Sequence, residues 1–167
     1  MTPEISIRPT LHKDIPEVLA IYDDARKFMK SYGNTTQWSD DNYPGMDSLR
    51  EDMEQGISYV GIDPDGEVVM TFVLLEGDDP TYEIIYDGEW LDSKPYATIH
   101  RMASKRKYPG MLGKCVEFCF KKIPNLRSDT HKDNLPMRKA LRRAGFKECG
   151  LIICRNGTLR VAYQKIK

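Results

Sequence analysis

Residues 128–146, "SDTHKDNLPMRKALRRAGF", combine a strand end, a helix start and a helix stop within one segment. Asp133 or Asn134 can cap a helix, and Gly145 is the residue expected just past a helix end. Between them, apolar residues recur at helical spacing on one stripe, namely Met137, Ala140, Leu141 and Ala144. Because residues 125–130 are typical of a short strand, the segment predicts a strand that leads directly into a capped amphipathic helix.

A second segment, residues 99–119, reads "IHRMASKRKYPGMLGKCVEFC". A strand ends there, a basic run follows at residues 105–107, and Gly110 and Gly113 open a helix predicted over residues 111–122. The free amides and the positive dipole end of such a helix start can bind an anion. The spacing is neither that of a P-loop nor that of a dinucleotide-binding GxGxxG motif. A purely structural turn is the alternative.

Periodicity and turn residues predict the remaining elements, and Asp14 with Glu17 has the spacing of a capping box at the first helix. In chain order these elements begin with a strand over residues 5–8, helices over 14–29 and 47–55, and a hairpin over 57–76 that turns at Asp-Pro-Asp-Gly. A polar insertion over 77–94 follows, with weak strand character at 82–86. The remaining elements are a strand over 96–104 and a closing hairpin over 149–166 that turns at 155–158. The order predicts one α+β or mixed α/β domain over residues 1–167.

Composition limits the classes of function. Lys plus Arg and Asp plus Glu each count 25, so the formal net charge is zero. Binders of nucleic acids and of anionic membranes usually carry a basic excess, so we expect neither partner. No apolar run approaches the roughly 20 residues of a membrane span, and the first ten residues lack a secretory signal, so we expect a cytoplasmic protein. The four cysteines form no CxxC pattern, so we expect reduced thiols and no metal.

Together the two quoted segments resemble the GNAT superfamily of acetyl-CoA-dependent N-acetyltransferases. That family has a [Q/R]-x-x-G-x-[G/A] loop after a strand, and later an Asn that starts a helix ending in Gly-Phe. Here "KYPGML" at residues 107–112 stands at the loop position, and Asn134 with Gly145-Phe146 at the later one. The fragments "IHRMA", "DTHKDN" and "AYQK" are similar to those of small bacterial members. The resemblance covers almost the whole chain and implies a mixed, mostly antiparallel central sheet flanked by helices.

The resemblance also implies the reaction. The chain would move an acetyl group from acetyl-CoA to a primary amine of a small molecule or peptide, by direct attack on the thioester. An amide near Met102 would polarise the thioester carbonyl, and Asn134 would contact the pantetheine arm. The cofactor-binding residues implied in this way are Met102, Ala103, Ser104, Lys107, Gly110, Met111, Leu112, Gly113, Lys114 and Asn134.

Two departures from the family pattern affect these assignments. In the loop, Lys107 replaces Gln or Arg, Leu112 replaces a small residue, and Pro109 has no amide to donate. In addition, many members carry a tyrosine four residues before the Gly of Gly-Phe, and that tyrosine protonates the departing thiolate. This chain has Leu141 there, which cannot donate a proton. Another group must therefore act as the acid, or the thiolate leaves without one.

His100 is the candidate general base, because it lies on the predicted strand beside the expected thioester and an imidazole can accept a proton near neutral pH. The alternative is a structural histidine that is hydrogen-bonded in the core. His131 is expected to orient the turn before the last helix, and His12 to be solvated. Glu83 and Glu89 are weaker candidates for the base.

The acceptor pocket is expected between the loop after the first helix and the insertion before the central strand. Aromatic side chains there would suit an amine cation or an apolar acceptor, and ordinary packing is the alternative for each. The side chains concerned are Gln37, Trp38, Tyr43, Tyr82, Trp90 and Tyr96, of which Trp38, Trp90 and Tyr96 are the predicted acceptor contacts. Acidic residues dominate residues 23–92, which favours a cationic acceptor.

Two other functions are compatible with the sequence, since a fold alone does not determine activity. A non-catalytic acyl-CoA sensor, favoured by Leu141 and the imperfect loop, would bind acetyl-CoA without turnover. A scaffold domain would not bind it, and could dock a partner on the basic outer face of the last helix, formed by Arg138, Lys139, Arg142 and Arg143. The closing hairpin is a candidate interface for a homodimer.

Overall fold

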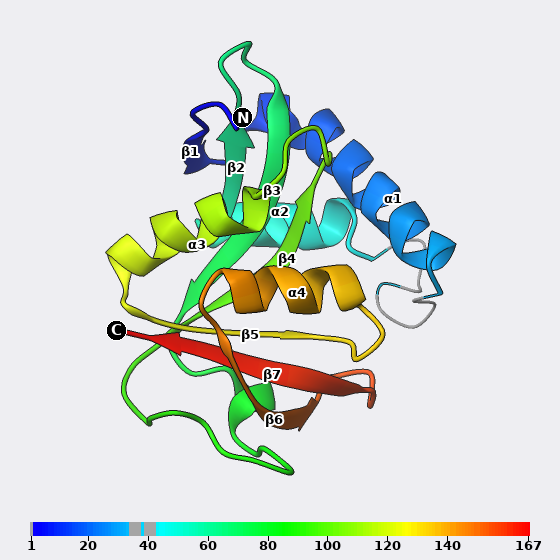
Figure 1. The fold of residues 1–167 in the computed structure, drawn as a ribbon. Coiled ribbons are helices and arrows are strands. Elements are labelled where there is room, and N and C mark those ends of the chain that lie inside the picture. The colour runs from blue at the N-terminus through cyan, green and yellow to red at the C-terminus, as the bar shows by residue number, and fades with distance from the viewer. Residues whose placement is uncertain (1, 34–37, 39–42) are drawn as a thin grey trace.

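In the described part of the chain the strands form a seven-stranded sheet with the order β1-β2-β3-β4-β5-β7-β6 (Figure 1). The computed structural model describes residues 2–33, 38 and 43–167. The strands are β1 (Ser6–Pro9), β2 (Ser58–Ile62), β3 (Val68–Glu76), β4 (Ala97–Ser104), β5 (Asn125–Thr130), β6 (Lys147–Ile153) and β7 (Leu159–Ile166). Neighbouring strands are antiparallel except β4 and β5, which are parallel. The predicted α+β domain with a mixed, mostly antiparallel sheet is therefore confirmed.

Helices cover both faces of this sheet. They are α1 (Ile15–Ser31), α2 (Met46–Glu54), α3 (Met111–Lys122) and α4 (Leu135–Arg143), with the short 3-10 turns η1 (His12–Asp14) and η2 (Pro80–Tyr82). Figure 1 views the sheet from the side of α3 and α4, and α2 passes behind the strands. On the near face Leu141 of α4 packs with Phe72 and Leu126, and on the far face Val18 and Leu49 pack with the strands. No helix in the described part of the chain could span a membrane.

The predicted capping box of the first helix is wrong. The carboxylate of Asp14 accepts hydrogen bonds from the Leu11 amide and from Arg8, at 2.6–3.0 Å, because η1 precedes α1 and turns Asp14 back toward β1. Glu17 instead accepts from the amide of Val68 at the start of β3, at 3.1 Å. Both carboxylates therefore join the helix to the sheet rather than cap its first turn.

The segment between β3 and β4, residues 77–96, is called here the β3–β4 insertion. The weak strand character predicted for residues 82–86 reduces to one bridge, in which Tyr86 and Leu151 exchange amide hydrogen bonds of 2.8 Å. Gly88 brings the insertion so close to β6 that an added Cβ would lie 1.9 Å from the Cys149 carbonyl oxygen. The insertion is thus attached to β6 by a short contact that does not extend into a paired strand.

The parallel strands β4 and β5 separate soon after they meet. They pair only at Ala97↔Leu126 and Thr98↔Arg127. On its other side β4 contains a bulge, because Thr71 pairs with Ala103 whereas Val73 pairs with His100, which leaves one extra residue on β4. Arg101 lies in this bulge with a positive φ of 49°. The carboxyl ends of the two strands therefore diverge, and an opening forms between them.

Candidate active site

The edge of β4 that faces β5 is open beyond Thr98. Within the described chain, the one side-chain hydrogen bond across this gap is donated by Ser128 Oγ to the Ile99 carbonyl, at 3.0 Å. The side chain of Met102 packs toward the near-face core and that of Ala103 toward the far-face core. The opening is therefore bordered by the main chain of Met102, Ala103 and Ser104, as an added strand would require.

The start of α3 lies next to this opening. Gly110 has a φ of 76°, the left-handed conformation that glycine adopts without strain, and an added Cβ would meet no atom within 4 Å. The side chains of Met111 and Leu112 are buried in the near-face core, so the bulk of Leu112 does not enter the loop. Because the Lys114 amide is the first to bond back, at 3.2 Å to Gly110, the amides of residues 111–113 are left for an anion.

The lysines of the loop already have anionic partners on the β2–β3 turn. Lys107 Nζ donates to Asp63 at 3.0 Å and to Glu67 at 2.7 Å, and Lys105 Nζ donates to Glu67 at 3.1 Å. Burial alone would raise the pKa of Asp63, but hydrogen bonds from the Glu67 amide, Lys107 and Tyr108 lower that pKa to about 2. The ammonium of Lys107 thus attaches the loop to the turn rather than pointing free into solvent.

Asn134 caps α4 and is buried beside the opening. Its Oδ1 accepts from the Met137 amide at 3.3 Å and from the hydroxyl of Tyr32, which ends α1, at 2.7 Å. Of the two predicted caps, Asn134 is the one the structure uses. His131 Nδ1 accepts from the Asp133 amide at 3.2 Å and so orients the turn before the helix, as predicted.

Leu141 occupies the family's tyrosine position and is buried in the near-face core. Its neighbours there include Met111, Leu112 and Phe146. No proton donor can therefore act from this point of α4.

His100 lies on β4 one residue before Arg101, with its side chain one-quarter exposed (25%). Its Nε2 is 2.9 Å from Oδ2 of Asp79, which belongs to the β3–β4 insertion. Burial opposes ionisation of Asp79, but hydrogen bonds from His100 and from Thr81 lower the pKa of this carboxyl to about 2. The predicted base is thus paired with an ionised carboxylate, a partner that sequence reasoning missed.

The predicted acceptor contacts fall into two separate groups. Trp90 and Tyr96 lie on either side of the Arg127 guanidinium, whose carbon is 4.0 Å and 3.9 Å from the two ring centroids. Trp38 packs edge-on against Tyr22 at 5.8 Å, in the far-face core beneath α1. The structure therefore brings two of the three rings together and places Trp38 elsewhere. Gln37 lies outside the described residues.

A buried ion pair supports the bulge. Nε and Nη2 of Arg101 donate to the two carboxylate oxygens of Asp52 on α2, at 2.9 and 2.6 Å, and Nη1 donates to the Tyr43 hydroxyl at 3.1 Å. Asp52 was not singled out from the sequence, because its acidic neighbours on α2 make it look like one more exposed charge. A positive φ at an arginine likewise gives no local sequence signal.

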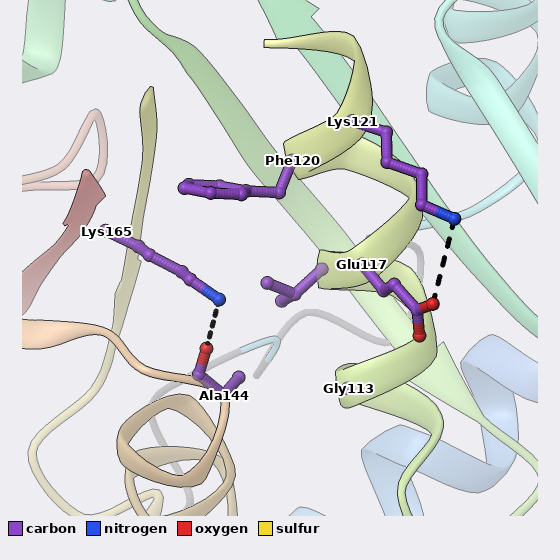
Figure 2. A pocket seen from close by; sticks show the side chains of 7 residues that line it. Gly113, Glu117, Phe120, Lys121, Ala144 and Lys165 are labelled. Atoms are coloured by element: carbon purple, nitrogen blue, oxygen red, sulfur yellow. Dashed lines mark hydrogen bonds and ion pairs between the residues drawn. The ribbon is translucent and has the colours of Figure 1, made fainter. Parts of the chain in front are cut away.

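A pocket of about 300 Å³ lies between α3, the end of α4 and β7 (Figure 2). It begins at Gly113, which directly follows the loop segment of residues 107–112, and extends along α3 to Phe120 and Lys121. Lys165 Nζ donates to the Ala144 carbonyl at 2.8 Å and lies 4.7 Å from the Phe120 ring centroid. Two lysines, an aromatic ring and the Glu117 carboxylate, which lies 3.8 Å from Lys121 Nζ, therefore line a hollow next to the start of α3.

Neither a family model nor a curated protein matches the chain. Several solved structures do match the chain. A GNAT-family acetyltransferase from Streptococcus agalactiae is 30% identical, covers 98% of this chain and 95% of its own, and has a TM-score of 0.89. One from Listeria monocytogenes is 20% identical over 98% and 95% of the two chains, with a TM-score of 0.67.

The aminoglycoside acetyltransferase AAC(6')-Ib, solved in complex with coenzyme A and kanamycin, is 15% identical over 98% and 95%, with a TM-score of 0.63. At this identity the likeness concerns the fold. The relative from Streptococcus agalactiae is similar in sequence as well, over nearly the full length of both chains. The chain belongs to the GNAT family of acetyl-CoA-dependent acetyltransferases.

Proposed function

We propose that the protein is an N-acetyltransferase that moves the acetyl group of acetyl-CoA to a primary amine of a small molecule or peptide. The observation that carries this proposal is the juxtaposition of an open strand edge at residues 102–104 with the glycine-started helix α3. The strand edge offers hydrogen bonds to an extended amide chain, and the helix start offers free amides to an anion. Pantetheine and pyrophosphate are such groups.

In this proposal each binding residue acts mainly through its backbone or through one polar group. Met102, Ala103 and Ser104 pair with the pantetheine arm, and Asn134 contacts it. The amides of Met111, Leu112 and Gly113 meet the pyrophosphate, with Gly110 leaving room for it and Lys114 adding charge. Lys107 supports the loop through its ion pairs to Asp63 and Glu67. The pocket beyond Gly113 would take the nucleotide end of the molecule.

The chemistry requires a base, because an amine with a pKa near 10 is only about one part in a thousand neutral at pH 7. His100 removes a proton from the ammonium, which a positioned base accelerates by roughly 10²–10⁴-fold. The amine nitrogen then bonds to the thioester carbon, polarised by the Met102 amide, the carbon–sulfur bond breaks, and the second proton that the nitrogen loses passes to solvent. Since Leu141 is buried and apolar, the sulfur leaves as thiolate, which a thiol with a pKa of about 8.5 allows.

The acceptor we propose is a cationic amine. Four acidic side chains are exposed on the β3–β4 insertion, namely Asp78, Glu83, Asp87 and Glu89. They would attract a cation to the side of the sheet on which His100 and Asp79 lie. Trp38 and Trp90 are half-buried and keep exposed surface for an acceptor, whereas Tyr96 is buried and supports Asp79. Kanamycin, bound by the similar AAC(6')-Ib, is one such cation.

Thermal unfolding with and without acetyl-CoA tests the binding half of the proposal. At a hundred times the dissociation constant the ligand adds about 2.7 kcal/mol to the free energy of unfolding. For a domain of this size the midpoint should rise by roughly 5–10 °C. Gly110→Glu should abolish the shift, because it places a negative charge at the anion site.

Gly157→Glu is the matched control. Gly157 also has a positive φ, of 81°, and open space around it, so the same strain and charge are introduced in the distant β6–β7 turn. This variant should keep the full shift. No shift for the wild type would overturn the proposal. Amine-dependent release of CoA thiol, measured with aminoglycosides, polyamines and lysine peptides, then tests catalysis and identifies the acceptor.

A further inference from the structure

We infer that Asp79 is a positioning residue, which holds His100 in the tautomer and orientation whose Nδ1 accepts the acceptor's proton. The inference rests on the proposed function, because it takes His100 as the base. It adds a second residue from a different element, since Asp79 belongs to the β3–β4 insertion and His100 to β4.

The hydrogen bonds of Asp79 determine which imidazole nitrogen carries the hydrogen. Oδ1 of Asp79 accepts from the Thr81 amide at 2.9 Å and from the Thr81 hydroxyl at 2.7 Å, while Oδ2 lies 2.9 Å from His100 Nε2. An ionised carboxylate can only accept, so Nε2 must donate. In the neutral ring Nδ1 is then the acceptor, and no hydrogen bond within the described residues occupies it.

The carboxylate is itself held in place. The Asp79 amide donates to the Tyr96 hydroxyl at 2.8 Å, and Asp79 caps η2, whose first residues are Pro80 and Thr81. Its side chain is only 11% exposed, so the ring cannot easily exchange it for water. The ring of Tyr82 lies beside the imidazole, with 6.4 Å between the centroids. His100 is therefore oriented on one side by a rigid acceptor and on another by an aromatic face.

The pair also compensates the charge that proton transfer creates. When a proton moves from the acceptor ammonium to Nδ1, the imidazole becomes an imidazolium and the amine becomes neutral. The positive charge then lies next to a carboxylate, so the His100–Asp79 pair passes from one net negative charge to none. In nucleophilic catalysis generally, a carboxylate that is hydrogen-bonded to a histidine base orients the imidazole and stabilises the imidazolium that forms. The charge of Asp52, which also interacts with His100, is paired with that of Arg101.

A histidine serving only the core would be satisfied on both nitrogens and shielded from the opening. His100 is instead one-quarter exposed, next to the bulge and at the point where β4 and β5 diverge. These three features separate the positioning role from a packing role.

The tautomer can be measured without any enzyme assay. Long-range proton–nitrogen correlation spectra of protein labelled with ¹⁵N-histidine should show the Nε2–H form of His100 in the wild type. In Asp79→Asn the amide can donate to Nε2, and the ring should change to the Nδ1–H form. Asp78→Asn is the matched control, since Asp78 is the exposed neighbour, and it should leave the spectrum unchanged.

Kinetics with the acceptor found by thiol release complete the test. Asp79→Asn should lower kcat by about 10²-fold, while the KM for acetyl-CoA and the thermal shift with acetyl-CoA stay at wild-type values. An Nδ1–H wild-type ring, or an unchanged ring in Asp79→Asn, would overturn the inference, and the wild-type spectrum decides even if the variant does not fold. A changed tautomer with unchanged kcat would also overturn it. If the wild type acetylates no amine, the proposed function fails, while the spectra still decide the Asp79–His100 contact.

Discussion

Replacement of Arg101 by alanine should lower the free energy of unfolding by about 3–5 kcal/mol, the usual cost of breaking a buried ion pair on one side. The Asp52 carboxylate accepts both hydrogen bonds of the pair and is only 5% exposed, so the variant leaves an unpaired charge in the interior. At about 2–4 °C per kcal/mol for a domain of this size, the midpoint of thermal unfolding should fall by roughly 6–20 °C.

A second variant separates the ion pair from the backbone strain. Arg101 has a φ of 49°, in the left-handed region that costs a residue with a Cβ about 1–2 kcal/mol. Arg101→Gly loses the same ion pair but adopts this φ without strain, and part of that gain is offset by the larger entropy of glycine in the unfolded chain. We expect Arg101→Gly to be more stable than Arg101→Ala by about 1 kcal/mol.

The loss of stability in Arg101→Ala should also depend on pH. Burial raises the pKa of Asp52, although Arg101 opposes this rise. A carboxyl with a raised folded-state pKa stabilises the fold most below its unfolded pKa, and this stability is lost as pH rises through the folded value. Removing Arg101 raises the folded pKa further. The destabilisation of Arg101→Ala should therefore be smaller at pH 5 than at pH 8.

Urea unfolding of the wild type, both variants, Asp52→Ala and Asp52→Ala/Arg101→Ala at the two pH values measures all three effects. The double variant should be more stable than the sum of the single changes predicts, because no charge is left unpaired. A loss below 1 kcal/mol in Arg101→Ala, or the same loss at both pH values, would refute the assignment of a buried, charged Asp52 partner.

Three further substitutions test the binding loop and its supports. Glu67→Gln removes one ion pair from each of Lys105 and Lys107 and one negative charge near the loop, so acetyl-CoA should bind about 2–5-fold tighter in calorimetric titration at low salt, and equal affinity would contradict this. Gly113→Ala should stabilise α3 by up to about 1 kcal/mol, since an added Cβ meets no atom within 4 Å, yet weaken acetyl-CoA binding, because the methyl group enters the anion site. Tyr32→Phe should cost about 1 kcal/mol in urea unfolding by removing the 2.7 Å hydrogen bond to Asn134, and no change would argue against that bond.

Elements with strong local signals could be predicted closely from the sequence. The bounds of α3 (Met111–Lys122) and β5 (Asn125–Thr130) agree with the predicted ranges, because glycine, proline and apolar periodicity act within a few residues. The cap at Asn134 was one of two local alternatives, and neighbouring residues were enough to propose both. The resemblance to the family then supplied the sheet, whose pairings join segments far apart in the sequence.

Features created by contacts between distant segments could not be predicted in this way. Lys107 was expected to face an anion, but acids at the β2–β3 turn, some forty residues earlier in the chain, accept its hydrogen bonds. The bulge at Arg101 depends on the register between β3 and β4, and the partner of His100 depends on how the insertion folds back. Charge and periodicity describe a residue's own segment and not the segment it meets.

The close approach of Gly88 to β6 has a consequence for how this enzyme could change its acceptor. Any residue with a Cβ at that position would push away from Cys149 the insertion that also carries Asp79. Substitutions that leave this contact intact are therefore those at exposed positions of the insertion, such as Asp78, Glu83 and Glu89. A library that randomises those positions and keeps Gly88 and Asp79 should alter acceptor choice while preserving proton transfer.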